Sequence, residues 1–130
     1  MNIIVCVKQV LDPEAPLESF KIDPVGNKMI RPPGVLPVIS AFDECAIEAA
    51  LRIKDSLGGI ITVLTMGANL LRDVAKKPLA MGADRLVLLE DGAFEGSDSW
   101  STAYALSKAI EKIGTYDLIL CGRQSADWDA

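Results

Sequence analysis

The chain has 130 residues and a net charge of −5, and half of its residues are hydrophobic. This length suits one domain with a buried core, and the excess of acidic residues argues against binding to a nucleic-acid backbone. Histidine is absent, which excludes Ser-His and Cys-His nucleophilic catalysis and the commonest metal ligand, and no apolar run approaches the roughly 20 residues that cross a membrane.

The first predicted element is a strand at residues 2–8, a short apolar run without the basic segment that would precede a signal peptide. A long proline-rich insert follows at residues 9–39. Within it, residues 20–31 form two strand-like runs around the turn Pro-Val-Gly-Asn, which predicts a small antiparallel hairpin at about residues 19–32. Its apolar residues favour an ordered hairpin over a disordered loop; they are Ile22, Met29 and Ile30.

Residues 41–57 predict the first helix. Ser40 stands where an N-cap belongs, and Asp43 and Glu44 suit the positive end of the helix dipole. Apolar residues recur at steps of three and four and predict the face that packs on the sheet. These residues are Phe42, Cys45, Ala49, Ile53 and Leu57.

Three more strands alternate with two more helices along the rest of the chain. The strands are predicted at residues 59–65, 84–90 and 116–122, and they lack polar alternation, as strands covered on both faces do. Alternation of this kind predicts an α/β fold in three layers, with a mostly parallel sheet, helices on both faces and right-handed crossovers. We expect one domain over residues 1–130.

The second helix is predicted at about residues 68–80, ending at Gly82, with Pro78 kinking or shortening its last turn. The third begins near Ser97 or Asp98 and ends at Gly114. It places apolar residues on one side, namely Ala103, Leu106, Ile110 and Ile113.

A ligand crevice in such a sheet lies beyond the carboxyl ends of the strands, where the strand order reverses. With the order 3-2-1-4, the candidate loops are Lys8 with Gln9, residues 65–68, residues 90–93 and residues 122–130. Neither G-x-G-x-x-G nor a P-loop motif occurs, so the fold is Rossmann-like without the dinucleotide fingerprint.

Gly67 and Gly122 would let the main chain approach a nucleotide closely, although the same glycines could simply make turns. Arg123, Gln124 and Ser125 add a cation, an amide and a hydroxyl. Asp127 and Asp129 suit ribose hydroxyls, helix capping or a solvated loop better than phosphate, and Trp128 could stack on a ring or pack.

The three cysteines, Cys6, Cys45 and Cys121, lie in apolar segments without CxxC spacing. We expect all three to be buried and inert, Cys6 and Cys121 in core strands and Cys45 on the inward face of a helix. Neighbouring parallel strands could bring Cys6 near Cys121, so a disulfide between them is the alternative.

Four segments together carry a family resemblance: "VKQVLDP", "SAFDECAIEAALRIKD", "LAMGADRLVLL" and "LILCGRQSADWDA". They resemble the N-terminal part of an electron-transfer flavoprotein β subunit over nearly the whole chain. The resemblance implies a cytoplasmic heterodimer with an α subunit, in which flavin carries electrons from dehydrogenases such as acyl-CoA dehydrogenase. It also implies a carrier without catalytic residues of its own, whose β subunit holds AMP or, in bifurcating members, a second FAD.

The resemblance also implies a set of nucleotide-binding positions at the strand ends. Two of them depart from the family pattern, because Ser40 stands where many relatives have Asn and Met66 replaces a smaller residue. The adenine contacts are therefore expected to differ in detail. The implied positions are Cys6, Ser40, Ala41, Phe42, Asp43, Met66, Gly122, Arg123, Gln124, Ser125, Ala126, Asp127, Trp128, Asp129 and Ala130.

In the family, the last of these loops continues into a glycine-containing helix start that cradles phosphate. We therefore interpret the chain as a truncated piece whose nucleotide site is incomplete, and expect weak nucleotide binding with adenine preferred over guanine. Two other interpretations remain: a stand-alone adenine-nucleotide sensor resembling universal stress proteins, which generally lack the hairpin at residues 20–31, and a remnant without activity.

Overall fold

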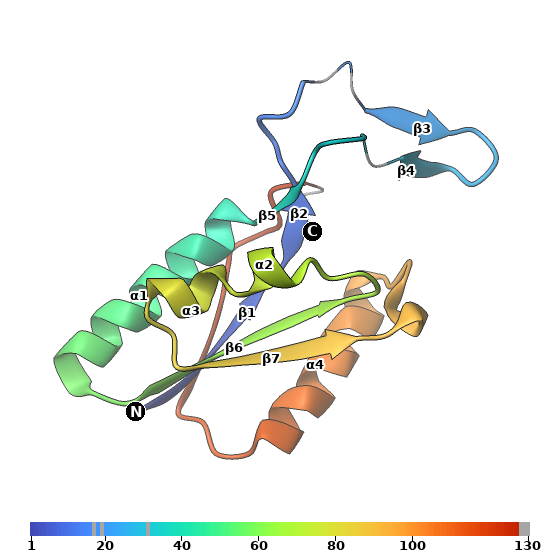
Figure 1. The fold of residues 1–130 in the computed structure, drawn as a ribbon. Coiled ribbons are helices and arrows are strands. Elements are labelled where there is room, and N and C mark those ends of the chain that lie inside the picture. Colours follow the sequence, from blue (N-terminus) through green and yellow to red (C-terminus); the bar gives the residue numbers. More distant parts are fainter. Residues whose placement is uncertain (17, 19, 31, 128–130) are drawn as a thin grey trace.

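The computed structural model describes residues 1–16, 18, 20–30 and 32–127. Its centre is a parallel four-stranded sheet in the order β7-β6-β1-β8 (Figure 1). The predicted order 3-2-1-4 is confirmed, and the reversal falls between β1 and β8. The strands are β1 (Asn2–Val7), β6 (Ile60–Gly67), β7 (Arg85–Glu90) and β8 (Leu118–Cys121).

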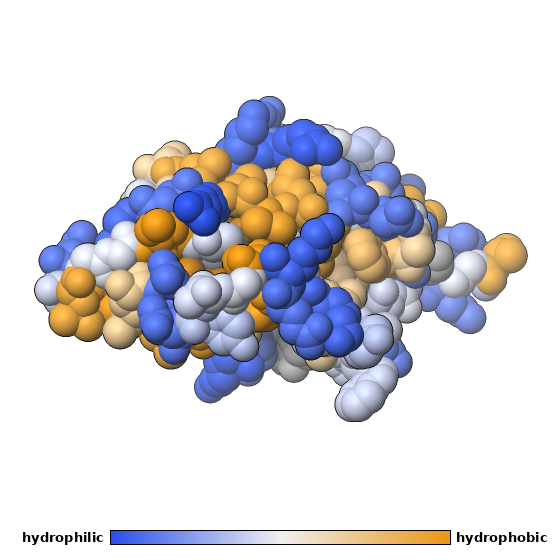
Figure 2. All heavy atoms as spheres, turned by 90° about the horizontal axis from the view of Figure 1, so that it is seen from below, coloured by the Kyte–Doolittle hydropathy of each residue, from blue (hydrophilic) through white to orange (hydrophobic). Residues whose placement is uncertain are grey.

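Helices cover both faces of this sheet, which confirms the three-layer prediction. On one face, α1 (Ala41–Leu57), α2 (Arg72–Ala75) and α3 (Lys77–Met81) pack on the main core. On the other face, α4 (Ser99–Ile113) contributes Ile110 to a smaller core with Ile4 and Leu64. Figure 2 shows hydrophobic residues gathered near the middle of one face of the molecule and hydrophilic residues around them.

Helix α1 has the predicted bounds, but the predicted inward face is wrong at three of its five positions, while Ile53 packs against the main core as predicted. Cys45, Ala49 and Leu57 are exposed, whereas Ala46, Ile47 and Ala50 are buried. Two stripes of this helix satisfy a period near 3.6, and apolar spacing alone does not choose between them. The buried stripe also contains Asp43, whose carboxylate bonds to backbone N–H groups at two strand ends and thereby fixes the rotation of the helix.

The single helix predicted at residues 68–80 is two short helices instead. The helical conformation begins only at Arg72, because other elements already satisfy the backbone before it: Leu70 N–H donates to Glu90, and the Gln9 side chain bonds both N–H and C=O of Leu71. Pro78 lies in the first turn of α3, where its missing N–H costs little, and Gly82 ends α3 with φ 123° as predicted.

Helix α4 agrees with the prediction at both ends. The Asp98 carboxylate caps it by accepting the Ser101 N–H at 2.7 Å, and Gly114 ends it with φ 95°. Leu106, Ile110 and Ile113 face the sheet, but Ala103 is exposed and does not belong to this face.

The predicted hairpin is present as β3 (Lys21–Asp23) and β4 (Lys28–Ile30), paired antiparallel. The hairpin projects from the sheet (Figure 1). Ile22, Met29 and Ile30 are exposed, so the burial of these side chains is not what makes the hairpin ordered. A second antiparallel pair, β2 (Gln9–Leu11) with β5 (Pro37–Ile39), was not predicted. It brings the two ends of the insert together beside the start of α1.

Candidate functional site

The carboxyl ends of β1 and β8 meet the first turn of α1 at the Asp43 side chain. One carboxylate oxygen accepts the Lys8 N–H at 2.7 Å, and the other accepts the Gly122 N–H at 3.1 Å. Burial raises the pKa of Asp43, while the two backbone N–H groups and the Lys8 charge oppose that rise. A single carboxylate therefore holds together the loops on both sides of the point where strand order reverses.

Gly122 is required here by close approach rather than by a left-handed turn. A Cβ at this position would contact the Asp43 carboxylate and lie 2.8 Å from the carbonyl carbon of Phe42. Gly67 is a milder case, since its Cβ would meet the flexible end of the Leu70 side chain at 2.7 Å. Gly122 is thus required by packing against the first turn of α1, and its predicted approach to a nucleotide stays a prediction.

Two cations lie around the start of α1. The Arg123 guanidinium stacks 5.6 Å from the centre of the partly buried Phe42 ring, and its Nε donates to Gln124. Lys8 Nζ forms a 2.9 Å ion pair with Asp127. Cation–π contact leaves the edge of the Arg123 guanidinium free to meet an anion beside the helix.

Three buried hydroxyl groups near these strand ends have no hydrogen-bond partner within the described part of the chain. Ser40 occupies the N-cap position of α1 without making the capping bond, Thr65 lies near the carboxyl end of β6, and Ser125 lies in the loop after β8. Burying an unpaired hydroxyl costs about 1–3 kcal/mol. Such groups are what a polar ligand at this edge would satisfy.

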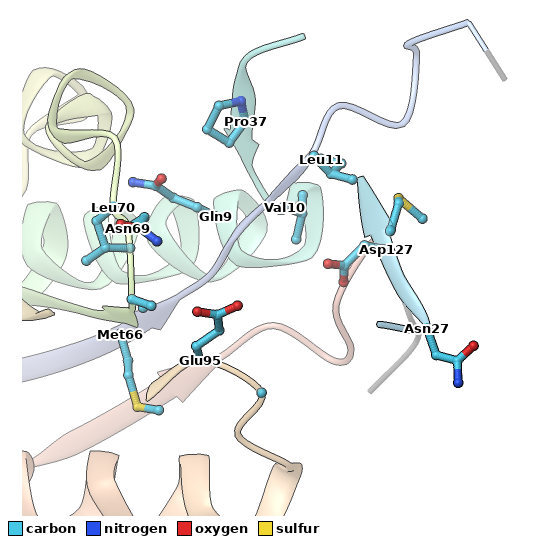
Figure 3. A pocket seen from close by; sticks show the side chains of 14 residues that line it. Gln9, Val10, Leu11, Asn27, Pro37, Met66, Asn69, Leu70, Glu95 and Asp127 are labelled. Carbon is cyan, nitrogen blue, oxygen red and sulfur yellow. The ribbon is translucent and has the colours of Figure 1, made fainter. Parts of the chain in front are cut away.

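A cavity of about 520 Å³, within the size range of small-molecule sites, opens at this edge of the sheet, and none of the three hydroxyl residues is among those that line it (Figure 3). Gln9, Met66 and Asp127 lie on its wall with Glu95, which comes from the loop after β7. Three of the four predicted loops therefore contribute directly. The hairpin side is closed by Met29 and Asn27.

The predicted positions divide into those that meet at this edge and those that do not. Met66 and Asp127 line the cavity, and Ala126 lines a smaller one of about 290 Å³ under the hairpin. Ala41 is exposed at the start of α1, and Cys6 packs on the opposite face of the sheet with the α4 residues. Trp128, Asp129 and Ala130 lie outside the described residues.

Sequence reasoning missed the contacts of one residue of this edge and missed a second residue altogether. Asp43 was assigned only to the helix dipole and the resemblance, whereas its main contacts cross to β1 and β8. Glu95 carries no motif and lies beyond the predicted loop at residues 90–93. Among the described residues, no group of three or more His, Cys, Asp or Glu side chains could hold a metal ion.

Comparison of the sequence with those of known proteins identifies a family and several relatives. The family model described as "Electron transfer flavoprotein domain" matches residues 35–130. The chain is 46% identical to the electron transfer flavoprotein subunit beta of Thermoanaerobacterium thermosaccharolyticum, covering 99% of this chain and 47% of that protein. It is 44% identical to protein FixA of Azorhizobium caulinodans and 45% identical to the subunit beta of Megasphaera elsdenii, with 99% of this chain and 46% and 48% of those proteins covered. The chain spans about half the length of these curated relatives.

Proposed function

Since the chain belongs to the electron transfer flavoprotein family, we propose that it is the nucleotide-binding part of a β subunit that carries electrons. The observation that carries this proposal is a cavity at the carboxyl edge of the sheet, with three buried hydroxyls near the same strand ends that lack a hydrogen-bond partner among the described residues. That edge is where doubly wound sheets bind ligands.

The ligand of this proposal is an adenine nucleotide, either AMP or FAD. Ser40, Thr65 and Ser125 would offer hydroxyls that lack other partners, and Arg123 would offer a cation beside the first turn of α1. The helix N-terminus adds a partial positive charge that favours phosphate. The residues present therefore fit a polar anionic ligand. A bound FAD would itself supply reversible electron transfer, whereas AMP would serve only as a structural ligand.

The partners of the proposal are an α subunit and dehydrogenases such as acyl-CoA dehydrogenase. The word "subunit" in the names of two relatives supports an assembly with another chain. In this proposal the flavin carries the electrons, and the chain contributes binding and orientation without catalytic residues of its own. A cytoplasmic location belongs to the same proposal and rests on the resemblance. Among the described residues, no helix has the length and apolar character to cross a membrane.

The alternative of a stand-alone nucleotide sensor is not supported. The hairpin β3–β4, which distinguishes the two interpretations, is formed in this chain. The names of the relatives also point to electron transfer.

A chimera tests the proposal. The first 130 residues of this chain would replace the matching half of the Thermoanaerobacterium relative, which is 46% identical there, and the product would be co-expressed with an α subunit of the family. We expect a heterodimer that contains flavin and an adenine nucleotide, identified by mass spectrometry after denaturation, and that passes electrons from a reduced dehydrogenase to a dye. The unmodified relative is the matched control. A folded chimera that binds the α subunit but retains no adenine nucleotide would overturn the proposed site.

A further inference from the structure

Cys6 and Cys121 are direct partners in neighbouring parallel strands. They stand opposite each other in the register of β1 and β8, so their side chains leave the sheet on the same face. Neighbouring strands lie about 4.8 Å apart, which falls within the Cα separation of roughly 4.4–6.8 Å found in disulfides. The pairing therefore satisfies the first geometric requirement for a bond between the two sulfur atoms.

The two thiols also interact with each other. A hydrogen bond with Cys6 lowers the pKa of Cys121 to about 7, although partial burial and the Asp43 charge oppose this. The same hydrogen bond, followed by burial, strongly raises the pKa of Cys6. The lowered pKa makes Cys121 the more readily ionised thiol of the pair, and the thiolate is the nucleophilic form.

Access to the pair is unequal. Cys121 is exposed and belongs to β8, the last strand in the order of the described sheet, whereas Cys6 is partly buried against the α4 residues. The prediction that Cys121 is buried is therefore wrong. Cys121 is the more accessible thiol of the two to a reagent in solution.

We propose that Cys121 and Cys6 form a redox-active dithiol, in which Cys121 attacks a low-molecular-weight disulfide and Cys6 resolves the mixed disulfide. With oxidised glutathione, the Cys121 thiolate forms a bond to one glutathione sulfur and releases the other as a thiolate. Cys6 then attacks the Cys121 sulfur, forms the Cys6–Cys121 bond and releases the second glutathione. The two cysteines lose two electrons and glutathione disulfide gains them. The proton of Cys6 passes to one released thiolate, and the other released thiolate takes its proton from water.

The order of attack follows from the pair itself. The largest cause of the high pKa of Cys6 is its hydrogen bond with Cys121. Once Cys121 carries a glutathionyl group, its sulfur is no longer anionic and that cause disappears, so Cys6 becomes easier to ionise.

The bond would form next to the candidate site. Cys121 immediately precedes Gly122, and Cys6 lies two positions before Lys8. The backbone N–H groups of Gly122 and Lys8 both donate to Asp43. Oxidation would hold together the strand ends that Asp43 already links. This dithiol chemistry does not depend on the proposed nucleotide function, because it needs no bound nucleotide and no partner chain.

The test uses the third cysteine as its control. Cys45 is exposed on α1, away from the pair, so a Cys45→Ser protein contains only Cys6 and Cys121. That protein is treated with oxidised glutathione at neutral pH, alkylated and weighed by intact mass spectrometry. We expect the loss of two hydrogens, no alkylation, no stable glutathionyl group, and a peptide map that joins residues 6 and 121. Added reduced thiol should reverse the change.

Two further variants separate the roles of the thiols, with circular dichroism verifying that each is folded. In the Cys45→Ser background, Cys6→Ser should retain one glutathionyl group on Cys121, and Cys121→Ser should react many times more slowly at Cys6. The proposal is overturned if the parent with both cysteines keeps a glutathionyl group unresolved. It is also overturned if the parent fails to react, or if Cys6 reacts as fast without Cys121.

Discussion

The Asp43 carboxylate accepts the backbone N–H of Gly122 at 3.1 Å, joining two residues that lie 79 positions apart in the chain. Its second oxygen accepts the Lys8 N–H at 2.7 Å, so the first turn of α1 is bonded to both strands at the reversal of the sheet. These two hydrogen bonds set the geometry of the candidate site.

Asp43→Asn should destabilise the fold by about 1.5–3 kcal/mol at pH 7, because an amide can accept from one backbone N–H but presents its own N–H₂ to the other. Urea unfolding followed by circular dichroism gives this value. The matched control is Glu48→Gln on the exposed side of the same helix, where we expect a change within about 0.5 kcal/mol. Equal effects of the two substitutions would contradict the view that the two hydrogen bonds of Asp43 stabilise the fold.

The pH dependence of stability should differ in sign between Asp43 and Asp84. Burial raises the folded-state pKa of Asp43, so from about pH 4 up to that pKa the native state holds more protons and its stability falls as pH rises. The difference in free energy of unfolding between the unmodified protein and Asp43→Asn, which we call the gap, should therefore widen as pH is lowered from 7 to 4.

Asp84 provides the opposite case. The Ile61 N–H, and then Lys54, lower its folded-state pKa, so its contribution is complete above about pH 4 and is lost as pH falls through the lowered value. The gap for Asp84→Asn should shrink below pH 4. Urea midpoints at several pH values measure both gaps, and gaps that change in the same direction would contradict the assignment.

Gly122→Ala should cost about 1–3 kcal/mol, because its Cβ would press against the Asp43 carboxylate and lie 2.8 Å from the Phe42 carbonyl carbon. Gly92→Ala is the control, since a Cβ there meets no atom within 4 Å and Gly92 has no positive φ. Thermal unfolding of both variants measures the two changes in stability. A Gly122→Ala protein as stable as Gly92→Ala would show that close approach does not explain Gly122.

Ser40→Ala should leave the stability unchanged or raise it by up to about 1 kcal/mol, because the buried hydroxyl makes no bond that the substitution could remove. Replacement of an ordinary N-cap serine by alanine would instead lower the free energy of unfolding by about 0.5–2 kcal/mol. Asp98→Ala, at the bonded cap of α4, is the comparison and should show that loss. A similar loss at Ser40 would mean that this hydroxyl caps α1 and is not held for a ligand.

The sequence was sufficient for the strands, their order and the bounds of α1, because buried parallel strands and a helix with clear end signals depend on local pattern. The rotation of α1 was not predictable in this way. It depends on Asp43 bonding to Lys8 and Gly122, which are distant in the chain. The break before Arg72 likewise depends on Gln9 and Glu90, side chains from other elements.

The candidate site was only partly predictable for the same reason. Strand order selected the edge at which the cavity lies, so Met66 and Asp127 were predicted at it, and Gly122 was predicted in the loop that bonds to Asp43. The exposure of Cys121 was missed because the apolar run of β8 was interpreted as covered on both faces, although the predicted order already put this strand last. The hairpin itself was predicted, but the contribution of Met29 to the cavity was missed, because the β2–β5 pair that joins the two ends of the insert was not predicted.

The central claim, that the carboxyl edge of this sheet binds an adenine nucleotide, is tested most directly by two-dimensional NMR of the ¹⁵N-labelled chain during titration with AMP. This method detects binding too weak for calorimetry and identifies the amides affected. We predict saturable shifts centred on Lys8, Asp43, Met66 and Gly122, smaller shifts with GMP, and a loss of response in Ser40→Ala. The claim would be contradicted by AMP-induced shifts confined to the outer face of α4, by equal shifts with GMP, or by no shift at millimolar AMP.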